Sequence, residues 1–160
     1  MYVKNALTLA DAKQIAAAAE AEALKNNWRV TIAVLDDGGN LLFLQRLDEA
    51  PLGSIVVAQE KARTALLFKR PTKVFEEIIA SGRTAMLTLP GATPIEGGLP
   101  LLNNGQLIGA IGVSGVQSPQ DAQIAGAGVE VAAKLSMGSA AACMAIADGA
   151  GPARGAHLLS

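Results

Sequence analysis

The sequence has almost no histidine or cysteine: its 160 residues include one His, His157, and one Cys, Cys143. A single cysteine excludes an intrachain disulfide, and we interpret Cys143 as a buried, unreactive thiol rather than a nucleophile. A catalytic triad with His, a zinc site with two His ligands and a His general base all need histidines that this chain does not supply. We therefore predict no metal site.

An excess of charge and long apolar segments are also missing. The 13 Lys and Arg residues are balanced by 14 Asp and Glu residues, which gives a net charge of −1. No basic stripe is visible, so we do not expect nucleic-acid binding. No apolar run approaches the roughly 20 residues that span a bilayer, and the first residues do not resemble a secretion signal. We expect a cytoplasmic protein with no membrane partner.

Aromatic residues are scarce, with one Trp, one Tyr and three Phe, whereas Ala and Gly are abundant. The core must therefore come from Leu, Ile and Val and from close backbone packing. The patterns of caps, turns and apolar residues predict an α+β domain over residues 1–135 and an Ala/Gly-rich C-terminal extension over 136–160. The expected elements are a helix over 9–26 capped by Thr8 and Asp11, a hairpin of strands 30–35 and 41–47, a helix over 55–69 capped by Ser54, a helix over 73–80 capped by Thr72, a strand over 85–89, a hairpin of strands 99–102 and 106–115, and a helix over 118–135.

Two basic residues lie on apolar faces of these elements. Lys61 projects from the helix SIVVAQEKARTALLFKR between Val57 and Phe68, where it either extends to the surface or binds an anionic group of a ligand. Arg46 ends an apolar strand face and is either a solvated rim residue or a fork for a carboxylate. The helix itself is apolar nearly all round, which in a protein of this size indicates oligomerisation.

The stretch EGGLPLLNNGQLIGAIGVSG has very small side chains for a hairpin. Gly97 and Gly98 can expose backbone amides to an anion, and Ser114 can add a hydroxyl from the face of the strand that carries small residues. The alternative is that these small residues only admit a closely packed helix. Glu96 is the acid of this stretch that could serve in acid/base chemistry, unless it is simply solvated.

Three segments, LDDGGNLLFLQRLDEAPLGS, EKARTALLFKRPT and LPGATPIEGGLPLLNNGQLIGAIGVSG, resemble the GlcG/HbpS family of heme-degrading-domain-like proteins, which includes the C-terminal domain of PduO-type proteins. The resemblance covers roughly residues 5–135. It implies a profilin-like α+β fold with an antiparallel sheet of about five strands flanked by helices, and a homo-oligomer between a dimer and an octamer. Some relatives bind heme or iron, so heme is a possible cofactor, although the helix over 9–26 has no His.

Together these observations favour a small-molecule-binding oligomer of the GlcG/HbpS type. In its enzymatic form the hypothesis is a metal-independent isomerase or lyase that transfers protons on a small organic acid. Arg46 and Lys61 would hold the anion, the amides of Gly97 and Gly98 and the hydroxyl of Ser114 would bind it, and Glu96 or Lys61 would be the acid/base. The alternatives are a heme- or iron-binding protein and an accessory assembly partner of another enzyme.

Overall fold

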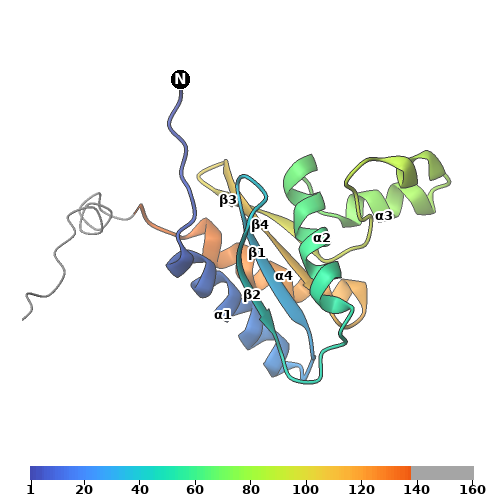
Figure 1. The fold of residues 1–160 in the computed structure, drawn as a ribbon, viewed down its shortest axis with the longest axis horizontal. Coiled ribbons are helices and arrows are strands. Elements are labelled where there is room, and N and C mark those ends of the chain that lie inside the picture. The colour runs from blue at the N-terminus through green and yellow to red at the C-terminus, as the bar shows by residue number, and fades with distance from the viewer. Residues whose placement is uncertain (138–160) are drawn as a thin grey trace, which may run out of the picture.

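The computed structural model describes residues 1–137 (Figure 1). Cys143, His157 and nearly all of the predicted extension therefore lie outside the described residues. The elements in chain order are α1 (Leu9–Lys25), β1 (Thr31–Asp36), β2 (Leu41–Arg46), α2 (Ser54–Phe68), α3 (Lys73–Ala80), the 3-10 helix η1 (Thr84–Thr88), β3 (Gly98–Asn103), β4 (Gln106–Ser114) and α4 (Ser118–Ala133). Among the described residues, no helix combines the length and the apolar character needed to cross a membrane.

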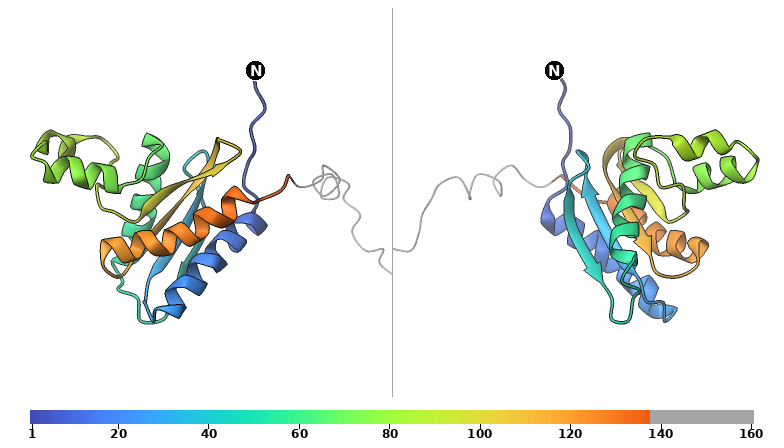
Figure 2. Two further views of the ribbon diagram at one scale, coloured as in Figure 1. Left: turned by 180° about the vertical axis from the view of Figure 1, so that it is seen from behind. Right: turned by 45° about the vertical axis from the view of Figure 1, so that its right-hand side comes forward.

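The strands form one antiparallel sheet in the order β2-β1-β4-β3, with helices on both faces. Helices α1 and α4 lie side by side on one face, and α2 crosses the other face (Figure 2). The larger core cluster joins α1 and α4 to alternate residues of the inner strands, such as Ile32, Val34 and Ile111. The smaller cluster joins α2 to Leu35 and Ala110. The predicted α+β class is confirmed.

Local sequence signals explain most of the element boundaries. The predicted capping box is present, because the Thr8 hydroxyl accepts the Asp11 N–H while the Asp11 carboxylate accepts the Thr8 N–H. The predicted cap at Ser54 is wrong: its hydroxyl donates to the Pro51 carbonyl oxygen and lies 2.7 Å from the hydroxyl of Thr31. Both hydroxyls are buried, so they pair with each other and anchor the start of α2 to β1.

The predicted strand over 85–89 is wrong, and the sheet has four strands instead of about five. These residues form η1, in which the N–H of Met86 donates to the carbonyl oxygen of Arg83 and the N–H of Leu89 to that of Met86. Short apolar runs do not by themselves distinguish a strand from another short element. Here the backbone hydrogen bonds close locally, so the segment needs no partner strand.

The small side chains of the β3–β4 hairpin are explained by α2. A Cβ atom on Gly112 would lie 1.9 Å from the carbonyl oxygen of Ala58, and one on Gly98 would lie 2.2 Å from that of Lys61. Real Cβ atoms do not approach backbone atoms this closely, so these two positions need glycine. The space in front of them is filled by the backbone of α2, which brings the Lys61 side chain against the hairpin.

Candidate functional site

Lys61 and Asp121 form a buried ion pair in the interior of the protein. The Lys61 ammonium lies 2.8 Å from Asp121 Oδ2, and each side chain is only 2% exposed. The ammonium also donates to the carbonyl oxygen of Val113, at 3.1 Å. Val113 is the next-to-last residue of β4. Lys61 comes from α2 and Asp121 from the first turn of α4, so the pair connects the two faces of the sheet at the end of β4.

Burial makes the charge on Asp121 costly. It raises the pKa of Asp121 above the ordinary value, while the hydrogen bond and charge of Lys61 and the N–H of Val116 lower it, and the charge of Glu96 raises it further. The Val116 N–H donates to Asp121 Oδ1 at 3.2 Å, so both carboxylate oxygens have partners. Removing one of two buried ions held in this way leaves the other without its partner and destabilises the fold.

Gly97 and Gly98 pack directly against this pair. Gly97 has a φ of +126°, and a Cβ atom there would lie 2.9 Å from Lys61 Nζ and 2.8 Å from the carbonyl oxygen of Val113. The N–H of Gly98 donates to Thr72 Oγ1 at 2.9 Å, and its carbonyl oxygen accepts the Thr72 N–H at 3.0 Å. Thr72, predicted as a helix cap, therefore fastens the start of α3 to β3 instead.

Glu96 borders the ion pair on the side nearer to solvent. Its side chain is 12% exposed, and its carboxylate lies 3.7 Å from the ammonium of Lys73, which is 55% exposed. Its backbone N–H donates to a carboxylate oxygen of Glu76 at 2.7 Å. The Lys73 ammonium also lies 3.9 Å from the carboxylate of Glu77. The site thus combines two ammonium groups, from α2 and α3, with four carboxylates.

Ser114 and Arg46 occupy one row across the sheet, because both pair with Thr31. Ser114 follows Val113 and is therefore next to the Lys61 site. Arg46 is exposed and lies two strands away, about 10 Å at the usual strand spacing. The structure brings Lys61, Glu96, Gly97 and Gly98 together with Ser114 beside them, and it leaves Arg46 at a distance.

Asp121 is the residue of the candidate site that the sequence analysis did not single out, because an acid in the first turn of a helix is an ordinary feature. The position of Asp121 among the apolar residues of α4 indicates that its side chain is buried. The buried residues of α4 are Asp121, Ile124, Ala125, Gly128 and Ala132, which recur at helical intervals. An acid on an apolar helix face needs a buried cation, and Lys61 was already placed on the apolar side of another helix.

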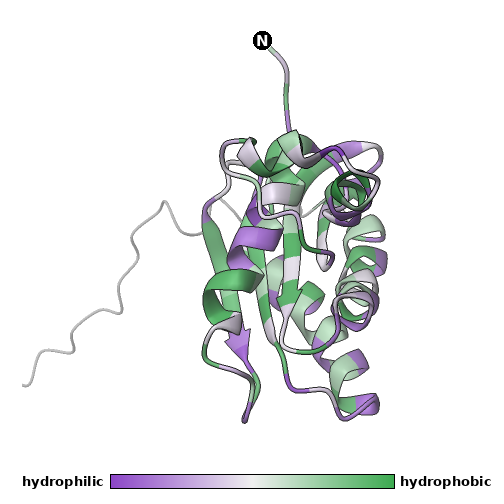
Figure 3. Cartoon of the chain, turned by 90° about the vertical axis from the view of Figure 1, so that its right-hand side faces the viewer, coloured by the Kyte–Doolittle hydropathy of each residue, from purple (hydrophilic) through white to green (hydrophobic). Residues whose placement is uncertain are grey.

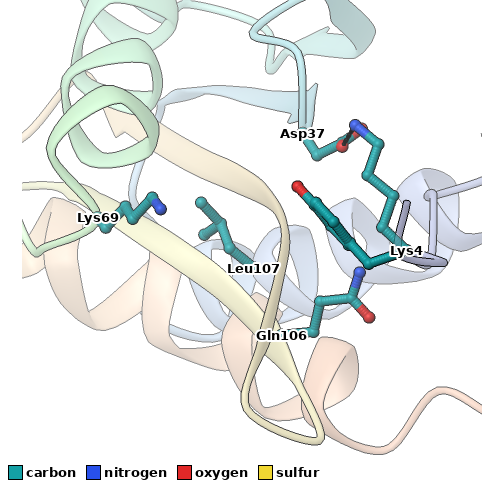
Figure 4. A pocket seen from close by; sticks show the side chains of 6 residues that line it. Lys4, Asp37, Lys69, Gln106 and Leu107 are labelled. Atoms are coloured by element: carbon teal, nitrogen blue, oxygen red, sulfur yellow. Dashed lines mark hydrogen bonds and ion pairs between the residues drawn. The ribbon is translucent and has the colours of Figure 1, made fainter.

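A separate pocket of about 280 Å³ lies at the opposite end of the sheet and is lined by Tyr2, Lys4, Asp37, Lys69, Gln106 and Leu107 (Figure 4). The ammonium of Lys4 is paired with the carboxylate of Asp37, and this hydrogen bond raises the pKa of Lys4. None of the predicted site residues lines this pocket, so it does not contribute to the Lys61 site. Within residues 1–137, no group of three or more His, Cys, Asp or Glu side chains is arranged to hold a metal ion.

Residues 7–130 match the family model described as "Haem degrading protein HbpS-like". The chain belongs to the HbpS-like family. It is similar to Protein GlcG of Escherichia coli strain K12, with 51% identity over 114 residues that make up 71% of this HbpS-like chain and 85% of GlcG. The resemblance seen in the sequence motifs is thereby confirmed.

Solved structures of relatives share the HbpS-like fold. The Klebsiella pneumoniae protein ORFY is 35% identical, with a TM-score of 0.78 over 85% of this chain and 97% of ORFY. The structure of a PduOC:heme complex is 27% identical, with a TM-score of 0.72 over 79% of this chain and 95% of PduOC. The second of these relatives was solved as a complex with heme.

Proposed function

We propose that this HbpS-like protein binds a small organic acid beside the Lys61–Asp121 pair and transfers a proton through Glu96. The observation that carries the proposal is an ammonium and a carboxylate 2.8 Å apart on side chains that are each 2% exposed. Buried ionisable groups with shifted pKa values are concentrated at functional sites. Positioned acids and bases of this kind support isomerase or lyase chemistry by proton transfer.

Charge balance indicates how an acid would bind. The cluster holds the ammonium groups of Lys61 and Lys73 and the carboxylates of Glu76, Glu77, Glu96 and Asp121. A further carboxylate would add to an excess of negative charge unless a proton enters with it. Burial and the charge of Glu96 already favour the protonated form of Asp121. The acid should therefore bind together with one proton.

Lys73 offers the acid its first contact. Its ammonium is 3.7 Å from Glu96, which is longer than a hydrogen bond, and the side chain is 55% exposed. Its other partner, Glu77, is 3.9 Å away, so an incoming carboxylate can replace Glu96 while the contact with Glu77 remains. Gly97 and Ser114 are the other proposed ligand contacts. Gly98 is not among them because its N–H donates to Thr72, and Arg46 is not because it lies two strands away.

We also propose a homo-oligomer, between a dimer and an octamer.

Isothermal titration with acetate, lactate and succinate tests this site. In buffers with different enthalpies of ionisation, binding of the preferred acid should show uptake of about one proton, because the cluster cannot accept another negative charge unbalanced. With lactate, exchange of the hydrogen at C2 with D₂O should fall about 100-fold in Glu96→Gln, the usual contribution of a general acid or base. Glu130→Gln, an exposed change on α4, is the control. Binding without proton uptake, or equal exchange rates in both variants, would contradict the proposal.

Heme is the second candidate, because a relative has been solved as a PduOC:heme complex. The described residues do not fit a heme iron held by His or Cys, since residues 1–137 contain neither. In the same residues, every buried side-chain nitrogen or oxygen already has a hydrogen-bond partner. No buried polar atom is therefore left without a partner, as one that contacts a missing ligand would be. The Lys61 site is therefore better suited to a small acid.

Titration with hemin separates the two candidates. We expect no shifted Soret band at a stoichiometric ratio of hemin to protein, because residues 1–137 supply neither of the two ligand types most used for heme iron. His157→Ala and Cys143→Ser should leave the spectrum unchanged. A shifted band that one of these variants removes would establish heme ligation from the C-terminal segment and overturn this expectation.

A further inference from the structure

The outer side of α2, opposite the sheet, carries a stripe of four residues that are exposed or partly exposed. Its members are Val56, Glu60, Arg63 and Leu67, spaced by four, three and four residues, so they lie on one helix face. Val56 is 62% exposed and Leu67 is 51% exposed. Figure 3 shows α2 in front of the sheet with polar residues between apolar turns.

The order of residue types along the stripe is complementary to its own reverse, because each acidic position meets a basic one and each apolar position meets another. From one end to the other it reads apolar, acidic, basic, apolar, as Val56, Glu60, Arg63 and Leu67. When two such helices lie antiparallel about a twofold axis near residues 61 and 62, Val56 faces Leu67 of the partner subunit. In the same register Glu60 faces Arg63 of the partner subunit, and the symmetry repeats each contact.

The two charges have no other described partner. Within residues 1–137, the ion pairs involve neither Glu60 nor Arg63. A parallel arrangement would place like charges together, whereas the antiparallel one pairs every charge and brings the exposed apolar side chains into contact. Leu52, two residues before the start of α2, is 75% exposed and can extend the contact beyond that end of the helix.

We infer that the outer stripe of α2 is the interface with a second copy of this chain, formed by antiparallel α2 helices with two Glu60–Arg63 pairs. This inference specifies the oligomer of the proposed function and rests on it. The stripe and Lys61 lie on different sides of α2, because Lys61 points to β4 and α4. Assembly through the stripe and binding of an acid at Lys61 are therefore separate properties of the same helix.

Sedimentation equilibrium of the full chain tests the interface by exchange of charges. Arg63→Glu places like charges together twice in each dimer and should raise the dissociation constant about tenfold or more. The double variant Glu60→Arg/Arg63→Glu restores opposite charges across the axis and should return the dissociation constant to within about threefold of the original. Lys134→Glu reverses an exposed charge at the end of α4, on the other face of the sheet, and should change nothing.

Each result has one meaning once circular dichroism shows that the variants are folded. Weakening by Arg63→Glu with recovery in the double variant supports the interface. A native chain that is monomeric at micromolar concentrations overturns both the interface and the oligomer of the proposed function. A native oligomer that Arg63→Glu leaves intact, or that the double variant fails to restore, overturns this interface alone. Titration with organic acids tests the ligand site independently of all three results.

Discussion

Replacing Lys61 with methionine should lower the free energy of unfolding by about 3–5 kcal/mol at pH 7, the usual cost of removing one member of a buried ion pair. Methionine has a similar length and fills the space, so the loss arises mainly from the charge left on Asp121. That carboxylate is 2% exposed and would retain only the Val116 N–H as a described partner. Urea unfolding monitored by circular dichroism measures the change.

The double variant Lys61→Met/Asp121→Leu distinguishes the effect of the two charges on stability from the effect of side-chain packing. Replacing both ions with apolar groups removes the desolvation cost along with the attraction, so this variant should recover most of the loss or exceed the native stability. If both variants are equally unstable, packing around Lys61 rather than charge determines stability here. If Lys61→Met alone is as stable as the native protein, the pair is not ionised in the folded state.

The loss in Lys61→Met should depend on pH in a direction that the pair dictates. Without Lys61, burial and the charge of Glu96 raise the pKa of Asp121 with less opposition than in the native protein. A raised pKa in the folded state favours the folded form below the unfolded pKa, about 3.9, and this stability is lost as the pH rises through the folded pKa. The deficit relative to the native protein should therefore be smallest near pH 4 and grow toward neutral pH.

Local signals in the sequence predicted the helices and hairpins well, because their causes are local. The Thr8–Asp11 box and the Asn104-Gly105 turn each depend on residues within a few positions of one another. The prediction of a strand over 85–89 was wrong because it also rested on a local signal alone. A strand needs a partner elsewhere in the chain, and a short apolar run carries no information about that partner.

The candidate site was predictable only in part, because its main contact joins residues 60 positions apart. The apolar surroundings of Lys61 were visible in the sequence, but the two outcomes considered for it, surface exposure or a ligand, did not include a buried acid. Thr72 was similarly placed at the start of α3, yet its bond to Gly98 depends on how α3 meets β3. Side-chain partners across elements follow from the packing, which the sequence pattern does not give.

Gly112→Ala should be the most damaging addition of a single methyl group in the described chain. The new Cβ atom would lie 1.9 Å from the carbonyl oxygen of Ala58 and 2.6 Å from the backbone nitrogen of Ala62. Both are backbone atoms of α2, so relief requires the whole helix to move away from β4. We expect a loss of about 3 kcal/mol or more, at or above the upper end for overpacked cores. Thermal and urea unfolding measure it.

Gly126→Ala is the matched control, since it adds the same methyl group at a helical position where no atom lies within 4 Å. It should raise stability by about 0.5–1 kcal/mol, because alanine loses less backbone entropy than glycine in a helix. Opposite signs at the two positions would show that close approach of α2 to β4 fixes Gly112. A small effect at Gly112 would mean that α2 can shift, and the positions of Lys61 and its ion pair on the same helix would then be less constrained than the packing indicates.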